Sequence, residues 1–313
     1  MKVNGILFLV ILSLLLLSAA SCQHKDIECP GASENIYVVF EWNRAPAADV
    51  AGMTLWFYRQ GPDCKVWRFD IAGRDGGEVE LPSGTYSMLA CNNDLPGIRF
   101  EDTDNAGAVH ATARHRLADG IYASTGMLYS TFVNYVEVTP CGVRYITPSG
   151  VVKECGYGRV RCQPDSTATQ YSVVLNHVTG IEGIRSVSAI LEGVRASMYL
   201  QNQCPSDTSV ALWIDMALDS GGSMLSGRGC AFSSQDDAHY RLTLRALRTD
   251  GRSMEKSIEL KPENINIVTQ HNVIIIVDGV NIPNDGPSAG IGGIGADVEG
   301  WEIVNIYPEA SFP

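Results

Sequence analysis

Regular alternation of apolar and polar residues in the second half of the chain constrains the fold more than any other feature. Within residues 209–218 and again within 239–248, apolar side chains recur at every second position. In the second segment, Arg241, Thr243 and Arg245 occupy the intervening positions. Because successive side chains of a strand point to opposite faces, this pattern predicts antiparallel strands with one buried and one solvated face.

Short strand-like runs continue through most of the chain. They are rich in β-branched and aromatic residues and are bounded by turn residues. They cover residues 36–42, 53–58, 65–71, 78–81, 85–91, 132–138, 196–201, 253–260, 271–280 and 301–307. Helical periodicity is almost absent, apart from one short turn predicted within residues 262–270. Residues 141–166 are rich in Gly, Pro and Cys and carry only a weak strand signal. The sequence therefore predicts an all-β protein built of antiparallel sheets.

The first 22 residues predict export. Lys2 precedes an almost unbroken apolar run over residues 6–17, and small residues at 18–21 lead into Cys22. A run of this length is typical of a signal peptide and is short for a transmembrane helix. The small residues before Cys22 resemble a bacterial lipobox, whose cysteine is acylated and becomes the new N-terminus. An ordinary cleaved signal peptide, with Cys22 left unacylated, is the alternative.

Length and composition predict how the chain is divided into segments and domains. We expect a signal peptide at residues 1–21, a lipidated tether at 22–35, and β-sandwich domains at 36–165 and 166–313. The formal net charge of −12 makes the chain a poor match for nucleic acid, whose phosphates require Lys and Arg. The same charge opposes docking on anionic lipid, so membrane attachment is assigned to the lipid at Cys22.

Nine cysteines are present, and eight remain once Cys22 is set aside. Export makes disulfides possible, but eight cysteines allow 105 pairings, and the sequence does not choose among them. The easiest local prediction is a disulfide between Cys155 and Cys162, across a Gly-containing turn. No Cys-x-x-Cys motif exists, so neither a zinc site nor a redox site is predicted.

Two glycine-containing motifs near the C-terminus resemble functional motifs but are better explained as loop sequence. Residues 286–290 match Gly-x-Ser-x-Gly around Ser288, yet glycines follow where a nucleophile elbow needs a helix. Residues 290–295 match Gly-x-Gly-x-x-Gly, but without the βαβ unit that a dinucleotide site needs. Both are interpreted as parts of a Gly-rich loop. No histidine pair has metal-ligand spacing, and no cofactor, metal site or enzymatic activity is predicted.

Several short motifs resemble those of one protein family. They lie at Cys22-Gln-His24-Lys25-Asp26, Val39-Phe40-Glu41-Trp42, Arg68-Phe-Asp70, Gly73-Arg-Asp-Gly76-Gly77, Leu81-Pro-Ser-Gly84-Thr-Tyr86 and Asn92-Asn93-Asp94. Together they resemble Bacteroidota surface lipoproteins of uncharacterised function that are related to fimbrillin-associated anchor and tip proteins. The resemblance covers most of the N-terminal half, and the C-terminal half is similar more loosely.

That resemblance implies two transthyretin-like, Greek-key β-sandwiches in tandem and attachment at the outer membrane. It also implies a role as an anchor or accessory (minor) subunit of a fimbria, with other fimbrial subunits as partners joined by strand addition. Lys25, Asp26 and Glu28 resemble the acidic signal that directs such lipoproteins to the cell surface, and an ordinary polar tether is the alternative. A surface lipoprotein that binds a glycan or a host protein is the alternative function.

Overall fold

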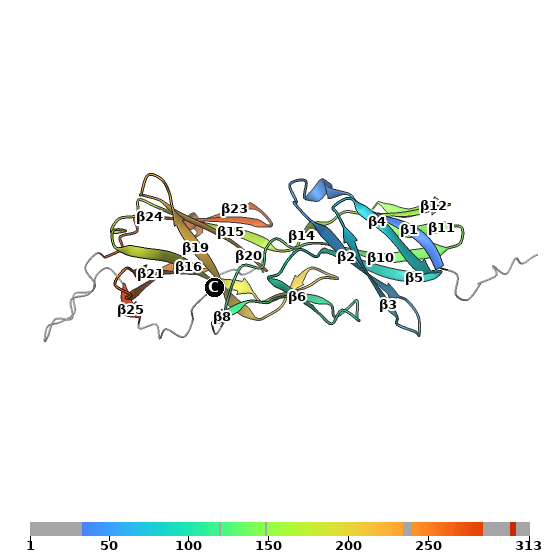
Figure 1. Cartoon of the computed structure of the whole chain (residues 1–313), viewed down its shortest axis with the longest axis horizontal. Coiled ribbons are helices and arrows are strands. Elements are labelled where there is room, and N and C mark those ends of the chain that lie inside the picture. The colour runs from blue at the N-terminus through green and yellow to red at the C-terminus, as the bar shows by residue number, and fades with distance from the viewer. Residues whose placement is uncertain (1–32, 119, 148, 234–239, 284–300, 305–313) are drawn as a thin grey trace, which may run out of the picture. The chain divides into compact units, whose positions relative to one another are not determined.

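The computed structural model describes residues 33–118, 120–147, 149–233, 240–283 and 301–304. Strands make up almost all of the regular structure in these ranges (Figure 1), so the prediction of an all-β fold is confirmed. The helices of the described residues are two 3₁₀ turns, η1 (Trp42–Arg44) and η2 (Pro262–Asn264), and η2 lies in the predicted helical turn. None of the described helices is long and apolar enough to cross a bilayer.

Two sheets enclose the first hydrophobic core. The smaller has the order β13 (Gly158–Cys162), β1 (Ser33–Phe40) and β4 (Gly76–Pro82). The larger has the order β12 (Gly150–Cys155), β11 (Gly142–Thr147), β10 (Tyr129–Thr139), β5 (Gly84–Asn92), β2 (Gly52–Arg59) and β3 (Val66–Ala72), with β14 (Asp165–Ser166) beside β10. Buried side chains from both sheets form one cluster, which includes Val38, Leu55, Leu81, Val136 and Val160. This arrangement is a β-sandwich.

A second sandwich follows in the C-terminal half. Its strands run in the order β23 (Ile265–Thr269), β24 (Asn272–Asp278), β15 (Thr169–Asn176), β20 (Leu225–Ala231), β19 (Ser209–Leu218), β16 (Ile184–Arg195), β21 (Arg241–Arg248), β22 (Ser253–Glu259) and β25 (Glu302–Val304). The sheet bends between β20 and β19, which pair only at Ala217 and Leu218. Side chains of both parts meet in a second core, which includes Val173, Leu191, Leu212, Leu242 and Val273.

Burial in these strands follows the predicted alternation. Leu242, Leu244 and Ala246 of β21 are buried, whereas Arg241 is exposed. Leu212 and Ile214 of β19 are likewise buried, and Leu218, at the end of the strand, is 47% exposed. The alternation therefore identifies the core-facing side of these strands correctly, except at the end of β19.

Parallel pairing is the main departure from the predicted antiparallel sheets. β1 pairs in parallel with β13, and β15 pairs in parallel with β24. The strand β4 lies on the other side of β1 and approaches it closely at Gly76, which has a φ of +129°. A Cβ atom at this position would lie 2.0 Å from the carbonyl oxygen of Val38, so only glycine fits.

The weak strand signal of residues 141–166 was misleading, because this segment forms β11, β12, β13 and β14. A period of two is present in β13, where Gly158, Val160 and Cys162 are buried and the arginines between them are exposed. The high content of Gly and charged residues hides this period. Both edges of the first sandwich that flank the cavity described below come from this segment.

Strands β6 (Ile98–Glu101), β7 (His110–Ala113), β8 (Arg116–Ala118) and β9 (Ile121–Tyr122) belong to the predicted N-terminal domain but join strands of the second half. β7 pairs with β17 (Ser197–Tyr199), which in turn pairs with β18 (Cys204–Pro205), and β9 pairs with β19. A third buried cluster includes residues of these strands, namely Ile98 of β6, Ala111 of β7 and Met198 of β17. The boundary at residue 165 and the transthyretin-like topology stay predictions.

Candidate functional site

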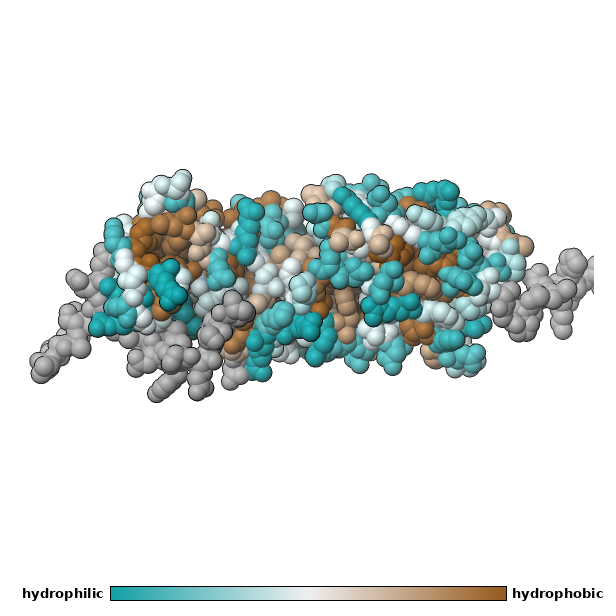
Figure 2. Space-filling model, in the orientation of Figure 1, coloured by the Kyte–Doolittle hydropathy of each residue, from teal (hydrophilic) through white to brown (hydrophobic). Residues whose placement is uncertain are grey.

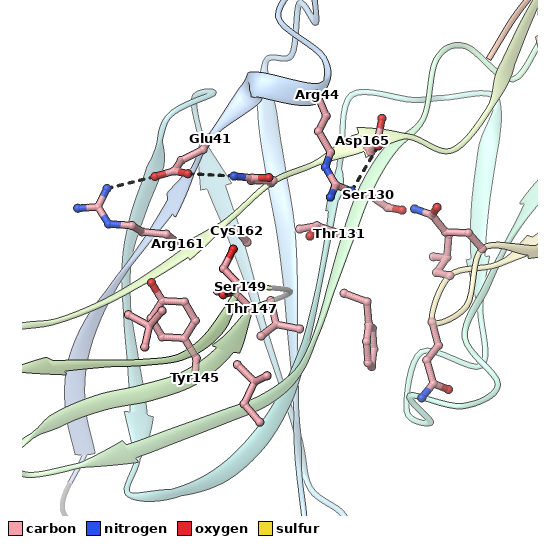
Figure 3. A pocket seen from close by; sticks show the side chains of 18 of the residues that line it. Glu41, Arg44, Ser130, Thr131, Tyr145, Thr147, Ser149, Arg161, Cys162 and Asp165 are labelled. Atoms are coloured by element: carbon pink, nitrogen blue, oxygen red, sulfur yellow. Dashed lines mark hydrogen bonds and ion pairs between the residues drawn. The ribbon is translucent and has the colours of Figure 1, made fainter. Parts of the chain in front are cut away.

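A hollow with a volume of about 640 Å³ lies beside the free edge of β13 (Figure 3). The strands β10, β11 and β12 supply the facing wall, and the turn after β17 closes one end. Its polar lining comprises Glu41, Arg44, Ser130, Thr131, Thr147, Ser149, Glu154, Arg161, Gln163, Asp165, Gln201, Asn202 and Gln203. Its apolar lining includes Phe132, Val133, Tyr145, Ile146, Val152 and Leu200.

The charges that line this cavity are paired with one another. Arg161 Nη1 donates to Glu41 Oε1 at 3.3 Å, and Arg161 Nε lies 3.8 Å from Glu154 Oε1. At the other end, Arg44 Nη1 lies 3.6 Å from Asp165 Oδ2. Figure 3 shows Arg161 beside Glu41 and Arg44 beside Asp165. Because each carboxylate faces a guanidinium, the lining offers little net charge to an ionic ligand.

Tyr145 lines the cavity together with Arg161 and Cys162 of β13. Its side chain is buried and, in Figure 3, points toward Arg161. Burial raises the pKa of Tyr145, and the backbone N–H of Arg161 partly offsets the rise. The phenol therefore lies beside a backbone group at the free edge of β13, where an added strand would need to pair.

The reactive groups in the cavity lack the partners that catalysis requires. Burial raises the pKa of the Cys162 thiol, which points to the carbonyl oxygen of Val39 at 3.6 Å. Ser130 shares a buried hydrogen bond of 2.6 Å with Thr167, and no histidine lines this cavity. A protonated thiol and a hydroxyl without a base are poor nucleophiles. The described residues also contain no group of three or more side chains suited to holding a metal ion.

The residues singled out from the sequence fall in different places. Cys22, the Gly-x-Ser-x-Gly motif around Ser288 and the Gly-x-Gly-x-x-Gly motif at 290–295 lie outside the described residues. Cys155 is exposed at the end of β12, and Cys162 is buried at the far end of β13. Both are free thiols in this structure. β13 rises by about 3.3 Å per residue from the turn, so a disulfide between them would require β13 to leave its pairing with β1. The pairing stays a prediction.

Three of the five tryptophans are buried in the protein. Trp42, Trp56 and Trp301 are buried, whereas Trp67 and Trp213 are half-buried. The indole N–H of Trp42 donates to the carbonyl oxygen of Arg74 at 2.8 Å, and that of Trp301 donates to the carbonyl oxygen of Asn281 at 2.8 Å. Both therefore have the polar partner that a buried indole needs. These rings do not form an exposed stacking platform.

A second feature with functional potential is the outer edge of the second sandwich, at β23. This strand pairs with β24 on one side and ends the sheet on the other. The side chain of Ile267 is 68% exposed and that of Val268 is 50% exposed. Figure 2 shows one face of the molecule, where apolar areas interrupt a mostly hydrophilic surface. An edge strand with exposed apolar side chains can accept another strand through its main-chain groups.

Comparison with known proteins places the chain in a family. The model of the family described as "Domain of unknown function (DUF5119)" matches residues 21–215, which is more than half of the chain. The chain belongs to the DUF5119 family. No curated protein matches it.

Several solved structures are similar to this DUF5119 chain at low sequence identity. A candidate adhesin from Bacteroides ovatus is 16% identical, with a TM-score of 0.62 over 85% of this chain and 98% of that one. A candidate polysaccharide-binding protein (DUF1812) from Bacteroides thetaiotaomicron is 15% identical, with a TM-score of 0.50 over 78% and 90%. The fimbrial anchor protein Mfa2 from Porphyromonas gingivalis is 12% identical, with a TM-score of 0.48 over 79% and 91%.

Proposed function

We propose that this DUF5119 protein is a lipid-anchored cell-surface protein that serves as an anchor or accessory subunit of a fimbria. The lipobox-like sequence before Cys22 supports export and attachment to the outer membrane. The fold shared with a candidate adhesin supports a role in contact with other molecules. In this proposal the protein acts by binding and not by catalysis, and its partners are fimbrial subunits.

The free edge of β23 is the observation that supports strand addition as the mode of contact. Ile265 and Ile267 face the same side as the buried Ile275 and Val273 of β24, with which they are in register. An added strand beside β23 would extend the sheet through main-chain hydrogen bonds and cover Ile267. β23 contains no Lys and no Pro, the residues that commonly block an edge. By contrast, Tyr145 occupies the space beside the edge of β13.

The membrane anchor is tested by Cys22→Ala in the native host. We expect loss of labelling by a radioactive or clickable palmitate, and release of the protein from the membrane fraction. A cysteine that is not processed, such as Cys64 in Cys64→Ala, provides the control and should leave both readouts unchanged. Retention of Cys22→Ala in the outer membrane would contradict the lipid anchor without bearing on strand addition.

Strand addition is tested by Ile267→Lys, which places a charge on the inner face of the edge strand. Pull-down from cells with native fimbriae should recover fimbrial subunits with the wild-type protein and lose them with the variant. Ile146→Lys is a matched control, because Ile146 is also an exposed apolar residue (46%) but lies on β11. Equal recovery with both variants would exclude β23 as the acceptor edge.

A surface protein that binds a glycan or a host protein is the second candidate, favoured by the cavity beside β13. Its charges are internally paired, and hydroxyl and amide groups make up much of the remaining polar lining. Such a lining suits an uncharged polar ligand. Recovery of host glycans or proteins, with no fimbrial subunit in the pull-down, would favour this candidate over the first.

A further inference from the structure

The strand that follows the predicted N-terminal tether is the middle strand of the smaller sheet. β1 lies between β13 and β4, and it pairs in parallel with β13. The register joins five residues of each strand, from Ile36 opposite Gly158 to Phe40 opposite Cys162. Because the two strands run in the same direction, the start of β1 and the end of β13 lie at opposite ends of this ladder.

The chain passes from the first sandwich to the second half at the end where β13 finishes. After β13, Asp165 and Ser166 pair with Ser130 and Tyr129 at the start of β10. Ser130 is also in register with Cys91, near the end of β5. The segments that follow β5, precede β10 and follow β13 therefore all leave the first sandwich at one end.

β1 also finishes at this end. Arg44, shortly after β1, lies 3.6 Å from Asp165, measured from Nη1 to Oδ2. The carboxylate of Glu41 accepts from Arg161 Nη1 at 3.3 Å and from Gln163 Nε2 at 3.4 Å (Figure 3). Tension between the start of β1 and the second half of the chain would therefore run along β1 and not across it.

Tension in this direction acts on the whole ladder at once. The hydrogen bonds of a parallel pair are evenly spaced along the strands, so pulling lengthwise strains them together, whereas peeling from one end breaks them in turn. Past the ladder, the N–H of Glu41 donates to the carbonyl oxygen of Cys162 at 2.8 Å. On the other side of β1, the N–H of Phe40 donates to the carbonyl oxygen of Asp75 at 3.1 Å. Main-chain bonds thus hold β1 from both sides.

Side-chain packing resists sliding as well. Ile36, Val38 and Phe40 are buried in the first core, whereas Tyr37 and Val39 on the other face of β1 are half-buried. Because side chains alternate along a strand, a slip by one residue would exchange the two faces. Such a slip would move all three buried side chains out of the core, so β1 cannot give way gradually.

We propose that β1 and β13 form a shear-loaded clamp that carries tension between the membrane tether and the rest of the protein. The inference rests on the proposed lipid anchor at Cys22, because that anchor makes the start of β1 the point where tension enters. It adds a mechanical role to the proposed function: the protein would hold a fimbria under load without unfolding. Resistance to forced unfolding depends on the unfolding rate, so the direction of the load matters as much as the free energy of unfolding.

The experiment is single-molecule force spectroscopy on the chain from residue 23 onward, with one handle at its N-terminus. The second handle is attached at Gln163→azidophenylalanine, just after β13, or at Tyr157→azidophenylalanine, just before it. Handles at the N-terminus and residue 163 load the two strands lengthwise in opposite directions. Handles at the N-terminus and residue 157 peel the strands apart from one end. Both positions are exposed and lie outside β13, so both variants should fold.

At one loading rate, the unfolding force should be at least about twofold higher with the handle at residue 163, because five register pairs yield together and not in turn. Loss of the contact between Gln163 and Glu41 works against this result. Urea unfolding verifies that the two variants are equally stable. Equal forces, or a higher force with the handle at residue 157, would overturn the proposal. Neither lipid nor fimbrial subunits take part, so the clamp and the acylation of Cys22 fail separately.

Discussion

The hydroxyl of Thr54 donates a 2.5 Å hydrogen bond to Asp70 Oδ1, across the register pair that these residues form between β2 and β3. Thr54 is buried, whereas the side chain of Asp70 is 54% exposed. This bond is the main reason that the pKa of Asp70 lies below its usual range, and Arg68 at 3.1 Å lowers the pKa further. The hydroxyl of Thr54 thus has the largest effect on the pKa of the exposed carboxylate of Asp70.

Thr54→Val, which keeps the side-chain shape, should raise the pKa of Asp70 toward its usual value near 4. Because the folded pKa of Asp70 is lowered, its ionised form stabilises the fold above that usual value. This stabilisation is lost as the pH falls through the folded pKa. The variant should therefore be less stable at pH 7, by up to about 1 kcal/mol, and this difference should shrink as the pH falls through the folded pKa of Asp70. Carbon-13 titration of the carboxylates and urea unfolding at both pH values measure these effects, and an unmoved Asp70 pKa would contradict them.

Leu244→Ala should lower the free energy of unfolding by about 2–5 kcal/mol, because Leu244 is fully buried in the second core. Leu218→Ala is the control, since Leu218 is 47% exposed and loses little contact. Its effect should stay within about 0.5 kcal/mol. Urea unfolding followed by tryptophan fluorescence measures both. Similar losses for the two variants would mean that β21 does not face the core as described.

The alternation of residues such as Leu242 and Leu244 was enough to predict the strand type and the buried face, because it is a local property of the chain. Pairing between distant strands is not local. Ile36 of β1 is in register with Gly158 of β13, and nothing in the spacing of either segment indicates this. The parallel pairs were therefore missed, although the all-β class was correct.

The candidate sites were missed for the same reason. Arg161 and Glu41 are 120 positions apart in the sequence, and they meet because β13 pairs in parallel with β1. The one local signal was the composition of residues 201–203, three amide side chains in a row at a turn that lines the cavity beside β13. Their chemistry is visible in the sequence, but the hollow beside them is not.

Thiol labelling should separate the cysteines by burial. Cys64, Cys141, Cys155 and Cys204 are exposed, whereas Cys91 and Cys162 are buried. Burial also raises the pKa of Cys230 to about 11, so its thiol stays protonated at pH 8. After mild reduction, we expect maleimide at pH 8 to label these four exposed thiols first, and to label Cys91, Cys162 and Cys230 only on unfolding. A peptide linked through Cys155 and Cys162 in the unreduced protein would instead confirm the pairing predicted from the sequence.

His271 should make the stability of the protein fall with decreasing pH below neutrality. Its pKa is lowered, chiefly by burial, while Asp165 opposes the shift. The unfolded chain therefore takes up a proton near pH 6.5, before the folded protein does, and each step down in pH favours unfolding. Stability from this group is complete above pH 6.5 and is lost as the pH falls toward the folded value. His271→Gln removes the titration and keeps a polar side chain, so its unfolding free energy should vary less between pH 7 and pH 5. His115→Gln is the control, since His115 is exposed. Parallel pH profiles for His271→Gln and the wild type would show that His271 titrates as it does in water.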